Sequence, residues 1–307
     1  VSKEHKVELV ITQPDRPSGR GMQSSGSPVK RESEKLGIPV FQPEDINSEE
    51  AIQKVKSVDP KAFALAAYGQ IISGKFLNLV DWPVNIHGSL LPKYRGAAPI
   101  NWAIIRGEDV TGITTIFMDE GMDSGPILLK DRTEIEENET AGDLHDRLAD
   151  MASNLVRETL AGLEDGSVKP TPQVGEPSFA PKLTRKDGLI NWNQSSTDVH
   201  NLIRGTYPWP GAYTFLKSRD KVKVCRSRDL GRLDGELLQR LLLPRVAENA
   251  DRGDIIDTGS LGLIVKCSEN TAVRITRVQP PSKCEMSGTD FVNGYHLDIG
   301  DKFVKPE

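Results

Sequence analysis

The sequence predicts an α/β domain with a doubly wound, mostly parallel sheet, followed by a small all-β domain. Over its first half, short apolar runs alternate with helical patterns, as expected where crossover helices join parallel strands. Beyond residue 186, short strand patterns follow one another between turns, which is typical of a small β-barrel. The stretch 166–185 is rich in proline and glycine and lacks periodicity. We therefore expect domains at 1–165 and 186–307, joined by a linker at 166–185.

The first domain is expected to alternate strands and helices along its length. Ser27 and Pro28 form an N-cap followed by a proline at the first helical position. A second helix starts in the segment 47–50, and Thr140 with Asp143 forms a capping box in front of a long amphipathic helix. The strands are expected at 7–12, 39–41, 62–67, 84–86 and 113–118.

The second domain is expected to start with a short helix at 196–204 and then to consist of strands. These strands are expected at 213–216, 221–225, 254–257, 262–266 and 272–278. In the second of them, Lys221 and Lys223 alternate with valines, so the two cations share one face. They belong to a basic stretch, 217–232, with seven cations against two acids. That stretch is either a solvated strand face, which is the simpler interpretation, or a surface for an anionic partner.

The composition excludes several classes of protein. Hydrophobic residues make up 37% and charged residues 27%, which fits a soluble globular chain. Because no run of 18 apolar residues occurs, neither a transmembrane helix nor a membrane partner is expected. The net charge of −5 argues against indiscriminate nucleic-acid binding. The three cysteines are far apart and the histidines are scattered, so we expect reduced thiols, no metal site and no nucleotide cofactor.

The residues with the strongest chemical signal follow two predicted strands. Asn85 and His87 are two apart at the end of the strand 84–86, so an amide and an imidazole point to the same side. Asp123 follows in a loop after the strand 113–118. Together these groups can support acyl transfer without a serine or cysteine nucleophile, provided that the acceptor substrate itself attacks. Asn85 and a protonated His87 would donate to the developing oxyanion, while Asp123 would keep the imidazole charged and accept the proton of the attacking group. Each residue alone has a structural alternative, so the prediction depends on their joint pattern.

The run Gly-Ser-Leu-Leu-Pro-Lys-Tyr-Arg-Gly-Ala-Ala-Pro at 88–99 resembles the core of the folate-dependent formyltransferases. Asn85, His87 and Asp123 stand at that family's Asn-x-His and distal Asp positions. The length of the run narrows the resemblance to the methionyl-tRNA formyltransferases. The resemblance implies a Rossmann-like catalytic domain and an OB-like barrel that contacts tRNA. It also implies that folate is bound by a segment of four residues, Ser89, Leu90, Leu91 and Pro92.

The implied reaction transfers the formyl group of 10-formyltetrahydrofolate to the amino group of methionine on initiator methionyl-tRNA, for translation initiation. Folate is then a co-substrate, and no metal is required. The resemblance further implies a monomer in the bacterial cytoplasm, or in a mitochondrion or plastid if the source is eukaryotic.

A turn-rich loop at 13–27 resembles the insertion with which these enzymes enter the acceptor end of the tRNA. It carries Arg16 and Arg20, which would meet phosphates or the unpaired end; the alternative is a mobile surface loop. The family usually has two lysines where this chain has residues 22–25, Met-Gln-Ser-Ser. Acceptor-stem affinity is therefore expected to be weaker, or to depend more on the basic stretch 217–232. Within that stretch, the predicted tRNA contacts are Lys221 and Lys223.

The chain departs from the family at its start. These enzymes normally have one more strand and helix ahead of the strand that starts here at Val7. A central parallel strand cannot be removed without exposing the backbone groups of its neighbours. We therefore expect the sequence to be a fragment, or an incomplete gene model.

Two other functions stay open at this point. Enzymes that formylate an amino sugar nucleotide share the Asn-His-Asp core and a similar Ser-Leu-Leu-Pro run, although the arginine-rich loop and the Pro-Trp-Pro-Gly segment at 208–211 favour tRNA. The missing first strand also suggests an inactive RNA-binding remnant, which the intact Asn85, His87 and Asp123 disfavour. Folate binding separates the two enzymes from the remnant, because a remnant should not bind it.

Overall fold

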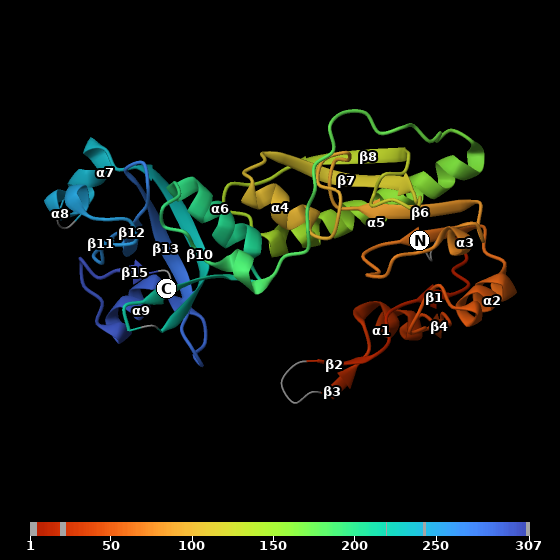
Figure 1. The fold of residues 1–307 in the computed structure, drawn as a ribbon, viewed down its shortest axis with the longest axis horizontal. Coiled ribbons are helices and arrows are strands. Elements are labelled where there is room, and N and C mark those ends of the chain that lie inside the picture. Colours follow the sequence, from red (N-terminus) through yellow and green to blue (C-terminus); the bar gives the residue numbers. More distant parts are fainter. Residues whose placement is uncertain (1–4, 19–22, 219, 242–243, 305–307) are drawn as a thin grey trace. The chain divides into compact units, whose positions relative to one another are not determined.

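The computed structural model describes residues 5–18, 23–218, 220–241 and 244–304 (Figure 1). The chain forms two compact units. The N-terminal unit consists of the residues through Ala97, Gly112–Arg132 and Leu148–Phe179. The C-terminal unit consists of Ala98–Thr111, Thr133–Arg147 and the residues from Ala180 onward. The domain limits expected at 165 and 186 stay a prediction.

The N-terminal unit is built on a mixed sheet with the strand order β5-β6-β7-β8. These strands are β5 (Ala62–Leu65), β6 (Trp82–His87), β7 (Val110–Phe117) and β8 (Ile127–Glu134). β5 runs parallel to β6, whereas β7 runs antiparallel to it. The expected α/β sheet is confirmed, but the antiparallel pair places the end of β7 beside Val84 instead of beside His87. A separate parallel pair joins β1 (Val10–Ile11) to β4 (Val40–Phe41).

Three helices begin where the sequence predicts. α1 (Pro28–Lys35) starts after Ser27, whose hydroxyl accepts a hydrogen bond from the Lys30 N–H at 3.1 Å. α2 (Glu49–Val58) starts after Ser48 in the same way and buries its apolar face in a core that includes Phe76 of α3 (Gly74–Leu77). α5 (Ala141–Asp165) starts at the capping box, where the Asp143 carboxylate accepts from Thr140 N at 3.0 Å.

The loop expected at 13–27 contains a hairpin that the sequence did not predict. β2 (Arg16–Ser18) pairs antiparallel with β3 (Gln23–Ser25). At the base of this hairpin, the Lys30 ammonium lies 2.6 Å from the Asp15 carboxylate, and Gln42 donates to the same carboxylate at 2.7 Å. Both contacts lower the pKa of Asp15.

The C-terminal unit is a curled antiparallel sheet with the order β11-β12-β13-β10-β9-β15, and β14 pairs with β13. Its strands are β9 (Ala212–Leu216), β10 (Lys221–Arg232), β11 (Ile255–Asp257), β12 (Leu263–Lys266), β13 (Thr271–Gln279), β14 (Met286–Ser287) and β15 (Phe303–Val304). Hydrogen bonds from Ile255 N to Asp301 O at 2.7 Å and from Phe303 N to Gly253 O at 2.9 Å join its two ends. The sheet therefore curls toward closure, as expected for a small OB-like barrel.

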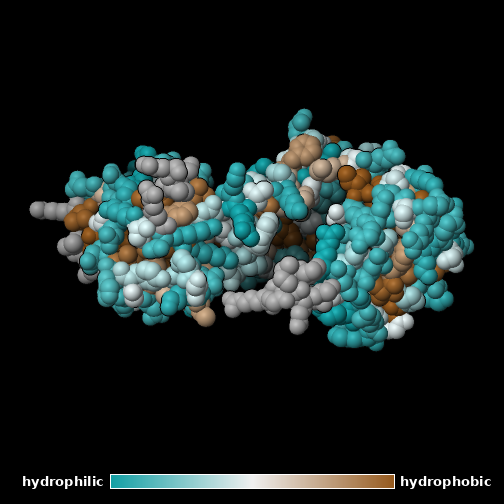
Figure 2. Space-filling view, turned by 60° about the horizontal axis from the view of Figure 1, so that its bottom comes forward, coloured by the Kyte–Doolittle hydropathy of each residue, from teal (hydrophilic) through white to brown (hydrophobic). Residues whose placement is uncertain are grey.

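Helices complete the C-terminal unit. They are α4 (Pro99–Ile105), α6 (Ser196–Thr206), α7 (Gly235–Arg240), α8 (Pro244–Asn249) and α9 (Gly288–Tyr295), with a 3₁₀ turn at Arg185–Gly188. The main core joins Val199 and Ile203 of α6 to Val224 of β10 and Phe291 of α9. α7 and α8 belong to a second apolar cluster, around Leu241 and Ile256. Hydrophilic residues cover most of the face that Figure 2 shows. No helix among the described residues has the length and apolar character needed to span a membrane.

A buried polar network ties α6 to the segment 136–139. The His200 Nδ1 lies 2.9 Å from Ser227 Oγ, and its Nε2 lies 3.0 Å from Glu137 O. The Arg204 guanidinium donates to Glu136 O at 3.0 Å. Burial is the main cause that lowers the pKa of His200, and the charge of Arg204 acts in the same direction.

The C-terminal unit is therefore expected to lose stability in mild acid. The pKa of His200 is lower in the folded than in the unfolded chain. The neutral ring's contribution to the free energy of unfolding is therefore complete above the unfolded pKa, about 6.5, and is lost as the pH falls through the folded pKa. Thermal unfolding between pH 7.5 and 5.5 should show this loss, and His200→Gln should reduce it. His145→Gln is the control, because that ring is exposed. An unchanged pH dependence in His200→Gln would contradict the assignment.

Candidate active site

The structure brings together the three side chains that the sequence singles out, all within the N-terminal unit. The Asp123 Oδ1 accepts a hydrogen bond from Asn85 Nδ2 at 3.2 Å, and its Oδ2 lies 3.5 Å from His87 Nδ1. The side chain of His87 is 6% exposed and that of Asp123 is 16% exposed. The carboxylate therefore faces both partners with little water between them, where electrostatic interactions are stronger than in bulk water.

The other ring nitrogen of His87 is held by backbone. Its Nε2 lies 2.9 Å from the carbonyl oxygen of Tyr94, so this nitrogen carries the proton and donates. Each ring nitrogen thus faces an oxygen, an arrangement in which an imidazolium can donate on both sides. The expected donation from His87 to a substrate oxygen has to use Nδ1, because Nε2 is bound to Tyr94. At 3.5 Å the Nδ1 contact with Asp123 is longer than a normal hydrogen bond.

Asp123 reaches this position through a loop that folds back over the sheet. Because β7 ends beside Val84, the loop after it must return toward His87. Phe117 N donates to Pro126 O at 3.0 Å and closes the loop at its base. At Gly125 a Cβ would lie 1.8 Å from Phe117 O, so only glycine allows this close approach. Asp123 itself has a φ of 49°, in the left-handed region that Asp tolerates better than most residues.

The segment 94–96 supplies two backbone groups that the sequence analysis missed. The Gly96 N–H donates to Asp123 Oδ2 at 2.8 Å, while Tyr94 O accepts from His87. Backbone atoms carry no residue-type signal, so a search for reactive side chains does not find them. The available signal was the glycine of the Tyr-Arg-Gly triplet, because Gly96 has a φ of +117°.

The predicted folate segment divides into buried and partly exposed residues. Ser89 and Leu91 are fully buried, and the Ser89 hydroxyl donates to Lys93 O at 2.6 Å. The buried hydroxyl of Thr114, on β7, accepts from Leu91 N at 3.2 Å and donates to Ser89 O at 2.6 Å. Ser89 and Leu91 therefore shape the segment, whereas the half-buried Leu90 and Pro92 stay available to a ligand. Folate binding by the four residues stays a prediction.

The predicted tRNA-binding residues lie in separate parts of the structure. Arg16 is exposed on β2, and Arg20 lies outside the described residues. Lys221 and Lys223 belong to β10 in the C-terminal unit, where the valines between and after them are fully buried. The alternation that the sequence predicts for this strand is confirmed.

The two lysines of β10 lie over aromatic rings. The Lys221 ammonium is 3.7 Å from the ring centroid of Tyr213, and that of Lys223 is 5.9 Å from the ring centroid of Tyr207. The Arg226 guanidinium lies 4.9 Å from the same Tyr207 ring. Burial, followed by the charges of two neighbouring cations, lowers the pKa of Lys221. We call this group of three cations and two tyrosines the cation–aromatic face.

Comparison with known proteins decides the family. The family model described as formyl transferase matches residues 2–160, and the one described as formyl transferase, C-terminal domain, matches residues 182–296. The chain belongs to the formyl transferase family. A methionyl-tRNA formyltransferase from Acetivibrio thermocellus is 41% identical over 303 residues, which cover 98% of this chain and 93% of that protein. The family resemblance of the central motif is confirmed.

Solved structures share the fold of this formyl transferase. An N-formyltransferase from Helicobacter canadensis, in complex with folinic acid and dTDP-3-aminofucose, matches with a TM-score of 0.63 at 16% identity, over 89% of this chain and 99% of that one. HypX from Aquifex aeolicus, in complex with tetrahydrofolic acid, matches with a TM-score of 0.59 at 16% identity, over 90% of this chain and 48% of that one. At these identities the likeness concerns the fold alone.

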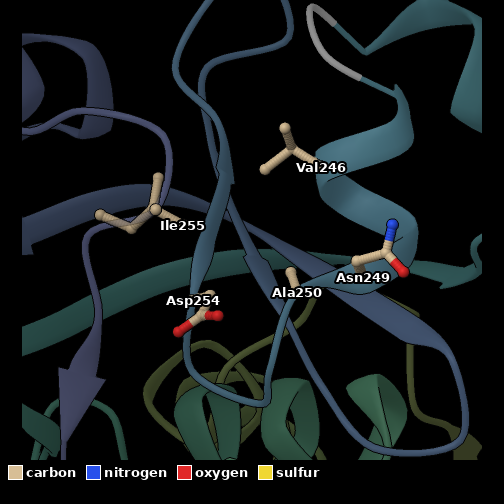
Figure 3. Close-up of a pocket in the computed structure, with 6 residues that line it drawn as sticks. Val246, Asn249, Ala250, Asp254 and Ile255 are labelled. Carbon is tan, nitrogen blue, oxygen red and sulfur yellow. The ribbon is translucent and has the colours of Figure 1, made fainter.

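The C-terminal unit of the formyl transferase has a hollow of about 390 Å³. Val246 and Asn249 of α8 line it together with Ala250, Asp254 and Ile255 (Figure 3). The Asp254 carboxylate pairs with Lys302 at 3.2 Å and so serves the closure of the barrel. No predicted site residue lines this hollow, and the described residues contain no group of three or more His, Cys, Asp or Glu side chains that could hold a metal.

Replacing Thr114 with valine is expected to destabilise the formyl transferase by about 1–3 kcal/mol, because it leaves Leu91 N–H and Ser89 O without their buried partner. Urea unfolding measures this change. The control is Thr171→Val, since that hydroxyl is exposed and its acceptor, Ile127 O, also accepts the Thr171 N–H. Equal losses of unfolding free energy in the two variants would show that the hydrogen bonds of the buried Thr114 hydroxyl do not stabilise the fold more than those of an exposed one.

Proposed function

We propose that this formyl transferase moves the formyl group of 10-formyltetrahydrofolate to the amino group of methionine on initiator methionyl-tRNA. The observation that carries the proposal is that the Asp123 carboxylate contacts both the Asn85 amide and the His87 imidazole. A relative of this chain over nearly its full length is named for this activity. An amide, an imidazole and a carboxylate match the needs of formyl transfer to an amine, namely oxyanion stabilisation and proton transfer.

In the proposed reaction, the methionine nitrogen attacks the formyl carbon and forms a tetrahedral intermediate. Asn85 has two amide protons; one is directed at Asp123, and the second is assigned to the developing oxyanion. The Nδ1–H of His87 adds a charge-assisted donor. The proton lost by the attacking amine passes to Asp123 and then to the folate nitrogen, as the bond between that nitrogen and the formyl carbon breaks. Folate is the co-substrate, and the half-buried Leu90 and Pro92 are assigned to its binding.

Asp123→Asn tests this site. The variant keeps the shape of the side chain and removes its charge, so formyl transfer is expected to fall by about 10²- to 10⁴-fold with the fold intact. The assay measures formylation of charged initiator methionyl-tRNA with 10-formyltetrahydrofolate, beside an amino sugar nucleotide as alternative acceptor.

Asp119→Asn is the matched control, because Asp119 lies in the same loop and accepts from Gly121 N at 3.0 Å, which an asparagine oxygen can also do. Activity within about threefold of wild type is expected for this control. If the unaltered chain formylates only the sugar nucleotide, the proposed acceptor is wrong.

We further propose that the cation–aromatic face and Arg16 contact tRNA, and that the barrel at 186–307 is the tRNA-contacting domain beside a catalytic domain at 1–165. Three cations stacked on tyrosines are suited to a polyanion whose bases also stack. The exposed Trp209, next to this face in sequence, adds a further aromatic surface. We place the enzyme in the cytoplasm as a monomer.

Replacing Lys221 and Lys223 together with alanine is expected to raise the KM for tRNA and to leave both kcat and the KM for the formyl donor unchanged. The salt dependence should weaken, with the slope of log affinity against log salt falling by up to about 0.9 for each phosphate contact removed. Lys54 and Lys56, two exposed lysines of α2, form the matched control pair. An equal rise in the KM for tRNA in the control pair would refute the assignment of this face.

A further inference from the structure

The segment 171–179 does more than connect the two predicted domains. At one end, Thr171 and Ile127 exchange backbone hydrogen bonds of 2.7 and 2.8 Å. At the other, Ser178 accepts from Tyr94 N at 2.9 Å through its hydroxyl and from Arg95 N at 2.8 Å through its carbonyl. All of these residues belong to the N-terminal unit. We call this segment the strap, because it is fixed at both ends and passes the loop that carries Asp123.

Between these ends, the side chain of Gln173 bridges two parts of the active site. Its Oε1 accepts from the Arg95 guanidinium, from Nε at 3.2 Å and from Nη2 at 2.7 Å. Its Nε2 donates to Asp123 O at 2.8 Å and to Gly125 O at 2.9 Å. An amide has two N–H donors and two acceptor lone pairs, and these four contacts use all of them.

The two parts that Gln173 joins set the position of the catalytic carboxylate from opposite sides. Asp123 and Gly125 form the backbone from which the carboxylate projects, with Asp123 at a φ of 49°. Arg95 precedes Gly96, whose N–H donates to that carboxylate at 2.8 Å. The Gln173 amide therefore fixes the distance between the backbone of Asp123 and the Gly96 N–H that binds its carboxylate.

The strap itself does not need this side chain. Its ends are held by backbone bonds at Thr171 and by Ser178, so the contacts of Gln173 act on the neighbouring loops. Without them, the Asp123 backbone would keep the bond at the base of its loop, from Phe117 N to Pro126 O. That bond closes the loop but does not determine how far its tip lies from Gly96.

We propose that Gln173 is a positioning residue for formyl transfer, which sets the contact of the Asp123 carboxylate with His87 without touching either substrate. The inference rests on the proposed function for its kinetic readout, but not for its structural one. Displacements of about 1 Å at a reacting group can reduce a rate by about 100-fold, so a positioning role has measurable consequences.

Two substitutions test the bridge, one by removing it and one by removing only its donor half. Gln173→Ala removes all four contacts. Gln173→Glu has the same shape and keeps the Arg95 contacts, but a carboxylate cannot donate to Asp123 O or Gly125 O and repels both. Both variants are expected to lower kcat by about 10- to 100-fold, with the KM for tRNA and for the formyl donor changed less than about threefold. Val174→Ala is the control, because its exposed side chain follows Gln173 directly in the strap.

A second measurement does not depend on activity. The ¹⁵N resonances of the His87 ring report on its contacts with Asp123 and Tyr94, and they are recorded for the folded wild type and all three variants. We expect them to move in Gln173→Ala and Gln173→Glu and to stay in place in Val174→Ala. Ring resonances that stay in place in both Gln173 variants would overturn the proposal, and so would a Gln173→Glu variant with the kcat of wild type.

These outcomes are separate from the fate of the proposed function. If the wild-type chain formylates neither charged initiator tRNA nor an amino sugar nucleotide, the proposed function fails. The His87 resonances still decide in that case whether Gln173 positions Asp123: movement in both variants supports the proposal, and unchanged resonances overturn it.

Discussion

The contacts of the Asp123 carboxylate are the interactions on which the rest of the candidate active site depends. It accepts from the Asn85 amide and the Gly96 N–H, and it faces the His87 ring. A carboxylate with little exposure to water needs such partners, because burying a charge without them is costly. The same contacts orient the amide and the imidazole to which the proposed reaction assigns a role. The contacts that satisfy the carboxylate are therefore also the contacts that orient the Asn85 amide and the His87 ring.

The antiparallel direction of β7 explains why loops have to hold the Asp123 carboxylate in place. In a fully parallel sheet, the ends of neighbouring strands meet at one edge, and residues that follow them are close by default. Here β7 ends beside Val84, so Asp123 is delivered by a loop that returns over the sheet. Gly125 allows the close approach to Phe117 O, and the strap holds the other side of the loop.

The C-terminal unit uses a different physical principle. Its apolar residues, including Val222 and Val224, form the inner face of a curled sheet, which leaves Lys221 and Lys223 on the outer face. The period of two in a strand makes these two results inseparable. Stacking on Tyr213 and Tyr207 then places the cations over aromatic rings, and the lowered pKa of Lys221 reflects burial and the neighbouring positive charges.

The sequence by itself determined what depends on short-range patterns. The cap at Ser27, the helix start within 47–50, the capping box at Thr140, and the alternation in β10 each involve residues within a few positions, whose geometry local stereochemistry sets. The family motif likewise pointed to Asn85, His87 and Asp123. The tertiary structure decided the direction of β7, the backbone partners at Tyr94 and Gly96, and the contacts of Gln173 in a segment that composition alone identifies as a linker. These features depend on residues 27 to 78 positions apart or on backbone atoms, and residue type at one position does not record such contacts.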